Sequence, residues 1–150
     1  MKILTHPDPF LVKKSEKVNE FSQELKKTVS DMIDAMYLYK GCGLASTQVG
    51  VNYCILVYDV STEKNNPIEM VNAEIIKSSG VKDEIEEGCL SFPGVTRNIM
   101  RSRKIRVKWQ SVEGNIYKMD FFGVEARVIQ HEIDHTNGIL FIDYINVEWK

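Results

Sequence analysis

The stretch from His131 to His135, with the sequence His-Glu-Ile-Asp-His, constrains the fold of this chain more than any other feature. Side chains four residues apart lie on one face of an α-helix, so a helix here would bring both imidazoles to a single metal ion. Glu132 follows the first histidine, where a carboxylate can take a proton from water that the metal activates. The alternative is a core helix with two satisfied histidines, which leaves Glu132 unexplained. The motif therefore predicts a hydrolytic metal site on a helix.

The pattern around the motif predicts that this helix is central in the fold. We expect it to follow Gly123 and to end at about Asn137. One face carries the two histidines together with Val124 and Val128. A second, nearly opposite face is apolar, with Ala126, Ile129 and Ile133, and the remaining sector is polar, with Arg127, Gln130 and Asp134. A helix that is apolar on two sides packs between layers and provides a rigid base for a metal site.

The rest of the chain is predicted to mix helix and strand. An amphipathic helix is expected over 22–40, capped by Ser22 and ended by Gly41, because its apolar residues recur every three or four positions. Strands are expected at 54–60, 68–78, 104–110 and 116–121, and a short final strand or extended tail at 139–145. We therefore predict a single α+β domain over 1–150, in which small β-sheets pack around a central metal-binding helix, with an N-terminal amphipathic helix covering the core.

Composition and charge exclude several classes of protein. A net charge of −2 provides no electrostatic footprint for nucleic acid or for an anionic membrane surface. The chain has no run of about eighteen apolar residues, and its N-terminus has neither an apolar signal core nor an amphipathic presequence. Three cysteines fit a reducing compartment better than a disulfide framework. We expect a cytoplasmic protein that binds no nucleic acid and no membrane.

A catalytic site of this kind needs a third protein ligand besides the two histidines. The residues after His135 include Asp143 and Glu148 but no histidine. Upstream, Cys89 lies in a turn after Gly88, and its thiolate is a candidate ligand. The alternative for this residue is a cysteine buried in a strand.

The stretch from Gly41 to Gln48 is a further unusual segment. By itself, a Gly-x-Gly run after a helix indicates only a helix end and a loop. Its small residues would also let a backbone or a ligand come close, with the Gln48 amide as a hydrogen-bond donor.

Together, these segments resemble the signature of the peptide deformylase family, which has Gly-x-Gly-Leu-Ala-Ala-x-Gln, then Glu-Gly-Cys-x-Ser, then Gln-His-Glu-x-x-His. This chain has the three motifs in the same order at 41–48, 87–91 and 130–135, with Ser46 in place of the second alanine. The His-Pro-Asp opening and the Asn-Gly-x-Leu-Phe stretch after the last motif also look like the family. The resemblance covers essentially the whole chain, and three ordered motifs are far more specific than one.

The resemblance implies a metal-dependent hydrolase that removes the N-formyl group from the N-terminal formylmethionine of newly made proteins and releases formate. It implies that Cys89, His131 and His135 bind one divalent metal ion, which is Fe(II) in cells and which nickel, cobalt or zinc can replace. Glu132 would be the general acid/base.

The resemblance also suggests how the substrate binds. Gln48 and the backbone N–H of Leu90 would stabilise the oxyanion. An apolar pocket for the methionine side chain would be lined by Cys42, Leu44, Glu86, Val124, Arg127, Val128 and His131, with Glu86 and Arg127 at its mouth. The peptide backbone would add as a strand beside Gly43 and Gly88, so downstream side chains would not be selected.

The chain departs from the family at four places. Cys42 occupies a position that an aliphatic residue near the substrate often holds. Ser46 puts a hydroxyl in a packed stretch and needs a partner, and Thr136 replaces a leucine and is expected to loosen the helix end. Many bacterial members continue into a C-terminal helix that docks on the ribosome, whereas this chain stops at Trp149-Lys150. We therefore expect a short form without that helix, and a monomer that contacts the ribosome only transiently.

Two other functions stay open. A zinc-dependent peptidase would share the helix motif, but it would use a third histidine or glutamate ligand and give no role to Cys89 or Gln48. An inactive binding module would keep the metal for structure and would need neither Glu132 nor Gln48.

Overall fold

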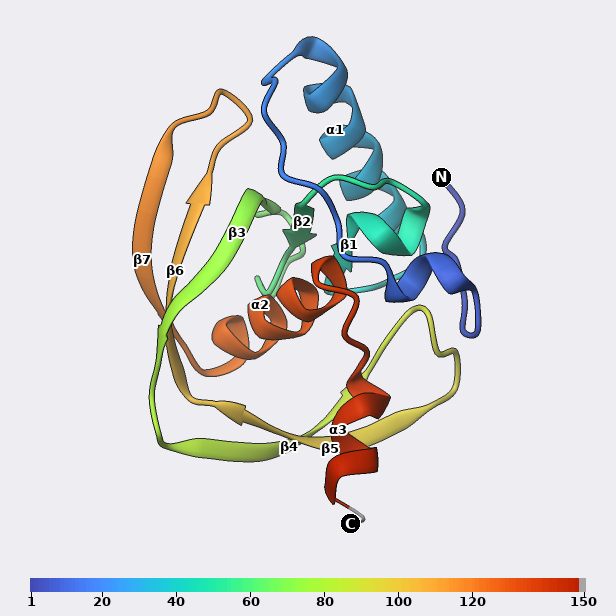
Figure 1. The fold of residues 1–150 in the computed structure, drawn as a ribbon, viewed down its shortest axis with the longest axis vertical. Coiled ribbons are helices and arrows are strands. Elements are labelled where there is room, and N and C mark those ends of the chain that lie inside the picture. Colours follow the sequence, from blue (N-terminus) through green and yellow to red (C-terminus); the bar gives the residue numbers. More distant parts are fainter. Residues whose placement is uncertain (149–150) are drawn as a thin grey trace.

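The helix α2 (Gly123–Thr136) lies at the centre of the fold, between two antiparallel sheets (Figure 1). The computed structural model describes residues 1–148, and for 145–148 it describes the backbone alone. Ala126, Ile129 and Ile133 of α2 pack in one buried cluster with side chains of the larger sheet. The predicted α+β class and the central helix are confirmed.

The larger sheet has the strand order β1-β2-β3-β6-β7 and is antiparallel throughout. Its strands are β1 (Gly43–Ala45), β2 (Ile55–Tyr58), β3 (Ile68–Ser78), β6 (Lys104–Gln110) and β7 (Ile116–Phe122). On β6, the alternate residues Ile105, Val107 and Trp109 are buried on the α2 side of the sheet. The four strands that the sequence pattern predicts are confirmed, with small differences at their ends, whereas β1 is too short to produce a pattern.

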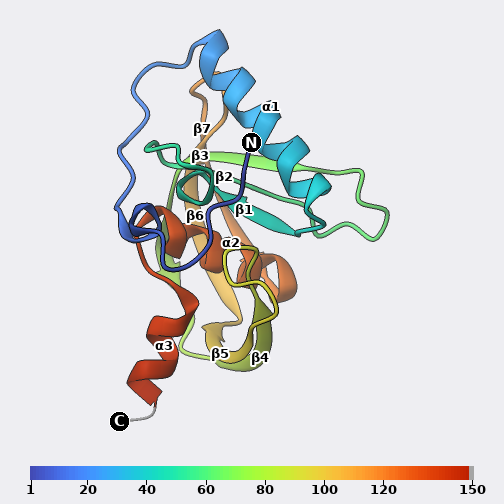
Figure 2. The same ribbon diagram turned by 90° about the vertical axis from the view of Figure 1, so that its right-hand side faces the viewer.

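Helix α1 (Gln23–Leu38) packs on β1 and β2 (Figure 2). The Ser22 hydroxyl caps its start by accepting a hydrogen bond from the N–H of Leu25 at 3.3 Å. The end of the helix differs from the expectation, because the left-handed residue is Lys40, with φ of 58°, and not Gly41. Gly41 serves close packing instead, since a Cβ there would lie 2.6 Å from Cδ1 of Leu90.

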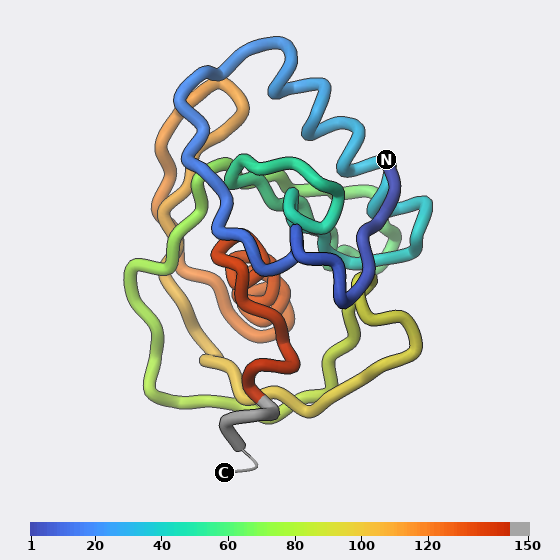
Figure 3. The backbone as a smooth tube through the Cα atoms, turned by 45° about the vertical axis from the view of Figure 1, so that its right-hand side comes forward, coloured from blue at the N-terminus to red at the C-terminus, as the bar shows by residue number. Residues whose placement is uncertain are grey.

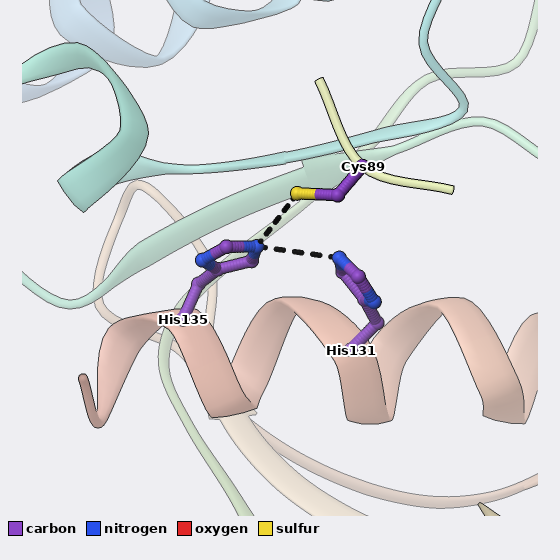
Figure 4. Close-up of side chains that lie close together, drawn as sticks. All are labelled: Cys89, His131 and His135. Carbon is purple, nitrogen blue, oxygen red and sulfur yellow. Dashed lines mark hydrogen bonds between the residues drawn. The ribbon is translucent and has the colours of Figure 1, made fainter. Parts of the chain in front are cut away.

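The smaller sheet is the hairpin of β4 (Lys82–Gly88) and β5 (Thr96–Ser102), which was not predicted. Its first strand has the sequence Lys-Asp-Glu-Ile-Glu-Glu-Gly, with acidic residues on both faces. No apolar alternation therefore marks β4 as a strand. The loop that follows β4 begins with Cys89 and brings it towards α2 (Figure 4).

The prediction of a final strand or extended tail at 139–145 is wrong, because the chain forms the helix α3 (Phe141–Glu148) there. The buried side chains of Leu140 and Phe141 pack with Leu11 and Phe92, and the Asp143 carboxylate accepts a hydrogen bond from the N–H of Leu140 at 2.9 Å. A helix thus lies at the C-terminal end of the described chain. Trp149 and Lys150, on which the expectation of a missing C-terminal helix depended, lie outside the described residues.

The N-terminal segment crosses the C-terminal end of α2 (Figure 3). The N–H of Ser15 donates to the carbonyl of Thr136 at 2.8 Å. Gly138, with φ of 75°, lies against Val12 of the short 3-10 helix η1 (Pro9–Val12), and a Cβ on it would be 2.5 Å from the Val12 carbonyl oxygen. None of the helices in residues 1–148 combines the length and apolar character that a bilayer crossing needs.

We expect Gly138→Ala to destabilise the protein more than Gly94→Ala, although both glycines have φ of 75°. The left-handed conformation alone costs about 1–2 kcal/mol for alanine, and a Cβ on Gly94 meets nothing within 4 Å. Gly138→Ala adds a backbone clash with Val12, which should cost a further 1–3 kcal/mol, approximately the cost of overpacking. Urea unfolding of both variants measures the difference, and equal losses would show that the N-terminal segment moves away freely.

Candidate metal centre

The structure brings together the three side chains proposed as metal ligands (Figure 4). The Nε2 atoms of His131 and His135 lie 3.2 Å apart, because the two residues are one turn apart on α2. The Cys89 sulfur reaches down from the loop after β4 and lies 3.3 Å from Nε2 of His135. The ligand atoms of all three residues lie within 4.8 Å of one another.

This arrangement fits a divalent metal ion. One thiolate and two imidazoles are the donor set that suits zinc, iron, cobalt or nickel. Nδ1 of His131 is 2.9 Å from the Glu87 carboxylate, so a proton on Nδ1 leaves the lone pair of Nε2 directed at His135. Nε2 of His135 lies 3.2 Å away, so with both rings in this tautomer each can offer an Nε2 lone pair to one cation.

Glu132 lies on α2 beside these ligands, as the motif predicts. Its carboxyl group is buried, and its Oε1 atom has no hydrogen-bond partner in the described chain. Burial raises its pKa from 4.5 to about 7. Gly43 leaves the room for this carboxyl group, since a Cβ on Gly43 would lie 2.5 Å from Oε2 of Glu132. A carboxyl group with this pKa can take up and release a proton near neutral pH.

Gln48 is held by hydrogen bonds beside Cys89. It belongs to the 3-10 helix η2 (Ser46–Val49), and its Oε1 accepts a hydrogen bond from the N–H of Ala45 at 2.9 Å. This bond turns the amide NH2 towards Ser91 Oγ at 3.1 Å and Cys89 Sγ at 3.6 Å. The hydroxyl of Thr47 donates to the carbonyl of His135 at 3.0 Å and so ties η2 to α2.

Leu90, the other residue expected to stabilise an oxyanion, follows Cys89 in a tight turn. The N–H of Phe92 closes this turn by donating to the carbonyl of Cys89 at 3.0 Å. The Leu90 side chain packs over Gly41, which fixes the turn beside the end of α1. The turn that carries Leu90 is therefore fixed between Cys89 and the end of α1.

A buried carboxylate, Glu87, organises the centre, although the sequence motifs predicted no role for it. Glu87 accepts from Nε of Arg101 at 2.6 Å, from Nη1 of Arg127 at 2.6 Å and from the ring of His131. Burial opposes its ionisation, but the hydrogen bonds from His131 and Arg101 prevail and lower its pKa to about 2. No sequence signal could have revealed this role, because β4 lacks apolar alternation and the partners of Glu87 are 14, 40 and 44 residues away in the sequence.

The residues expected to contact substrate differ in their exposure. Gly43 lies beside Glu132 and Val128, while Cys42, Glu86, Gly88 and Val124 are exposed. The side chain of Leu44 is fully buried in the cluster under α1 and offers no surface to a ligand.

Arg127 does not stand at the mouth of a pocket, which corrects the expectation. It is 8% exposed, and its guanidinium donates to Glu87 and to the backbone carbonyls of Asp83 and Ile99. A charged group at this position of α2 faces the β4–β5 hairpin, which the sequence pattern did not reveal.

The departures at Ser46 and Thr136 are accommodated locally. The Ser46 hydroxyl donates to the carbonyl of Tyr53 and also lies 3.5 Å from the N–H of Ile55. Thr136 is 2% exposed, and its hydroxyl donates to the carbonyl of Ile133 at 2.6 Å. The expected loosening of the helix end is therefore not seen.

Comparison with known proteins gives one consistent result. The family model described as polypeptide deformylase matches residues 1–149. A peptide deformylase of Thermotoga neapolitana is 44% identical over 138 residues, which cover 92% of this chain and 82% of the relative. The crystal structure of peptide deformylase from Thermotoga maritima has a TM-score of 0.92 and 43% identity, and the match covers 95% of both chains. A probable peptide deformylase from Synechococcus phage S-SSM7 has a TM-score of 0.89 and 41% identity, covering 95% of this chain and 98% of that one.

We expect Glu132→Gln to stabilise the metal-free protein at neutral and alkaline pH. Because burial raises the folded-state pKa of Glu132 from 4.5 to about 7, ionisation favours the unfolded chain. The unfolding free energy of the wild type should therefore fall as the pH rises from 4.5 to about 7. The variant cannot ionise at this position and should be more stable by at most about 3 kcal/mol near pH 8, with no such gain near pH 4. Urea unfolding in the presence of a chelator measures this difference, and a gain that does not change with pH would contradict the argument.

Proposed function

The chain belongs to the polypeptide deformylase family, and we propose that Cys89, His131 and His135 hold the single divalent metal ion on which its activity depends. As a peptide deformylase, the protein is an enzyme that removes N-formyl groups from nascent proteins. The observation that carries the proposal is the convergence of one sulfur and two imidazole nitrogens within 4.8 Å, beside a buried carboxyl group. We further propose Fe(II) as the native ion, with zinc, nickel or cobalt as substitutes.

The bound ion would supply Lewis acidity towards water and towards the formyl oxygen. Glu132 takes the proton of the attacking water and then delivers it to the amine nitrogen that leaves. Two observations support this role: its Oε1 has no competing partner in the described chain, and burial holds its pKa near 7. Formate and a free N-terminus are the products.

Negative charge develops on the formyl oxygen as the water attacks, and Gln48 with the backbone N–H of Leu90 would stabilise it. The Gln48 amide is already fixed by Ala45 and Ser91, so little reorganisation is needed. One such preorganised donor is typically worth ~3 kcal/mol of the barrier.

The peptide would dock through its backbone. Gly43 belongs to the edge strand β1, and Gly88 ends β4, whose second edge pairs with no strand of the described chain. An extended peptide between them could pair with both edges, while its methionine side chain lies near Val128. Backbone pairing does not distinguish downstream side chains, so formylmethionyl peptides of many sequences would be accepted.

We also propose that the enzyme acts in the cytoplasm as a monomer, with only transient contact with the ribosome. Its three free thiols, at Cys42, Cys54 and Cys89, are consistent with a reducing compartment.

Formate release from formyl-Met-Ala-Ser by the iron- or nickel-loaded protein tests the proposal directly. We expect formate without cleavage of the internal peptide bonds. Internal cleavage without formate would favour a peptidase, and bound metal with neither product would favour a binding module. If Cys89→Asp left metal content and activity unchanged, the assignment of the third ligand would fail.

Glu132→Gln should retain the metal and lose turnover by several orders of magnitude, because the proton then has no acceptor. Elemental analysis and the formate assay on the same sample check both statements. A rate close to the wild type would remove Glu132 as the base.

Gln48→Leu should lower kcat by about 100- to 1,000-fold with a small change in KM, because the donor acts on charge that exists only in the transition state. A rise in KM with unchanged kcat would instead make Gln48 a residue for ground-state binding.

A further inference from the structure

Arg127 is a buried arginine that connects α2 to both strands of the β4–β5 hairpin. Its Nη1 atom lies 2.6 Å from Oε2 of Glu87 and 2.9 Å from the carbonyl oxygen of Ile99 on β5. Its Nη2 atom lies 2.7 Å from the carbonyl oxygen of Asp83 on β4. One side chain thus joins the helix to two strands of a separate sheet.

The connection matters because the three candidate metal ligands come from these two elements. His131 and His135 belong to α2, whereas Cys89 follows directly after β4. Within residues 1–148 the hairpin shares no strand pairing with the larger sheet, so the distance from the sulfur to the two imidazoles depends on how the hairpin docks on α2. Glu87, the acceptor of Arg127, is two residues from Cys89 and also contacts the ring of His131 at 2.9 Å.

We propose that Arg127 is a positioning residue of the metal centre: it holds Cys89 over the two histidines and so controls how long the metal is retained. This role replaces the substrate contact expected from the sequence, since the guanidinium is buried among protein acceptors. The inference rests on the metal centre proposed above.

An arginine is suited to this position because its three acceptors, on Glu87, Ile99 and Asp83, lie in different directions from the side chain. A planar guanidinium presents several N–H groups in a fixed fork, whereas a lysine offers one compact ammonium group. The charges also balance: Arg101 and Arg127 are the cations, and Glu87 and Asp134 are the carboxylates, with Arg101 reaching Asp134 at 2.9 Å. Without Arg127, both carboxylates share one guanidinium, and a buried carbonyl on β5 loses its donor.

Release of cobalt(II) into excess chelator tests the proposal, because a thiolate–cobalt absorption band reports directly on the Cys89 bond. We expect Arg127→Met to release cobalt 10- to 100-fold faster than the wild type, approximately the effect of removing a partner that orients a metal ligand. For formyl-Met-Ala-Ser, turnover should fall as metal is lost, without the rise in KM that loss of a substrate contact would produce.

Gln130→Met is the matched control. Gln130 also anchors the hairpin to α2, through the N–H and carbonyl of Ser102 at 3.2 Å and 2.9 Å, but the structure gives it no contact with Glu87. The Gln130→Met variant should unfold at a lower urea concentration than the wild type, but it should release cobalt more slowly than Arg127→Met. If Arg127→Met fails to fold, Arg127→Lys keeps the charge and should still release cobalt faster than Gln130→Met.

Cobalt release at the wild-type rate from the Arg127 variants, or at the rate of Gln130→Met, would overturn the inference. A raised KM with unchanged release would return Arg127 to the substrate site. If the wild type shows the thiolate band and the expected order of release rates but produces no formate, the proposed reaction fails while the role of Arg127 stands. A wild type that binds no cobalt would overturn both.

Discussion

The candidate site depends on the docking of the β4–β5 hairpin against α2, and this contact is made largely by buried charges. Glu87, Arg101 and Arg127 are each less than one-tenth exposed. Taking such groups out of water costs several kcal/mol per ion, and the cost is offset here because Glu87 has four donor contacts at 2.6–2.9 Å. An apolar interface could stabilise the hairpin equally well, but it could not orient the ring of His131.

Glu132 is the opposite case, a carboxyl group whose burial outweighs the nearby charges of His131 and Arg101. Its Oε1 has no partner in the described chain, and burial raises its pKa to about 7. The same isolation that destabilises the ionised form makes the group able to exchange protons near neutrality. The contrast with Glu87, whose pKa is about 2, shows that two neighbouring carboxyl groups acquire different tasks from their surroundings. Rigid packing around Gly43 keeps Glu132 in this position.

Sequence patterns predicted the elements whose periodicity is clear. The strands over 68–78 and 104–110 have the predicted bounds, because one face of each is apolar near the core. The hairpin strand β4 escaped prediction because its acidic residues leave no alternation. The error at α3 has a different cause. The β-branched residues at 139 and 142 favour a strand. A helix forms instead because it buries Leu140 and Phe141 and because the Asp143 carboxylate caps its first turn.

The sequence by itself determined the helix α2, the two imidazoles on one of its faces, the adjacent acid and, through the resemblance, the cysteine and the glutamine. These features are local, or they are motifs with a fixed spacing, so they can be recognised along the chain. Only the tertiary structure decided which distant groups meet. Glu87 and His131 are 44 residues apart in the sequence and in contact in the fold, and Arg127 turned out to face a hairpin rather than a substrate. The residues next to a charged side chain in the sequence do not reveal its partner, because that partner depends on how separate helices and strands pack together.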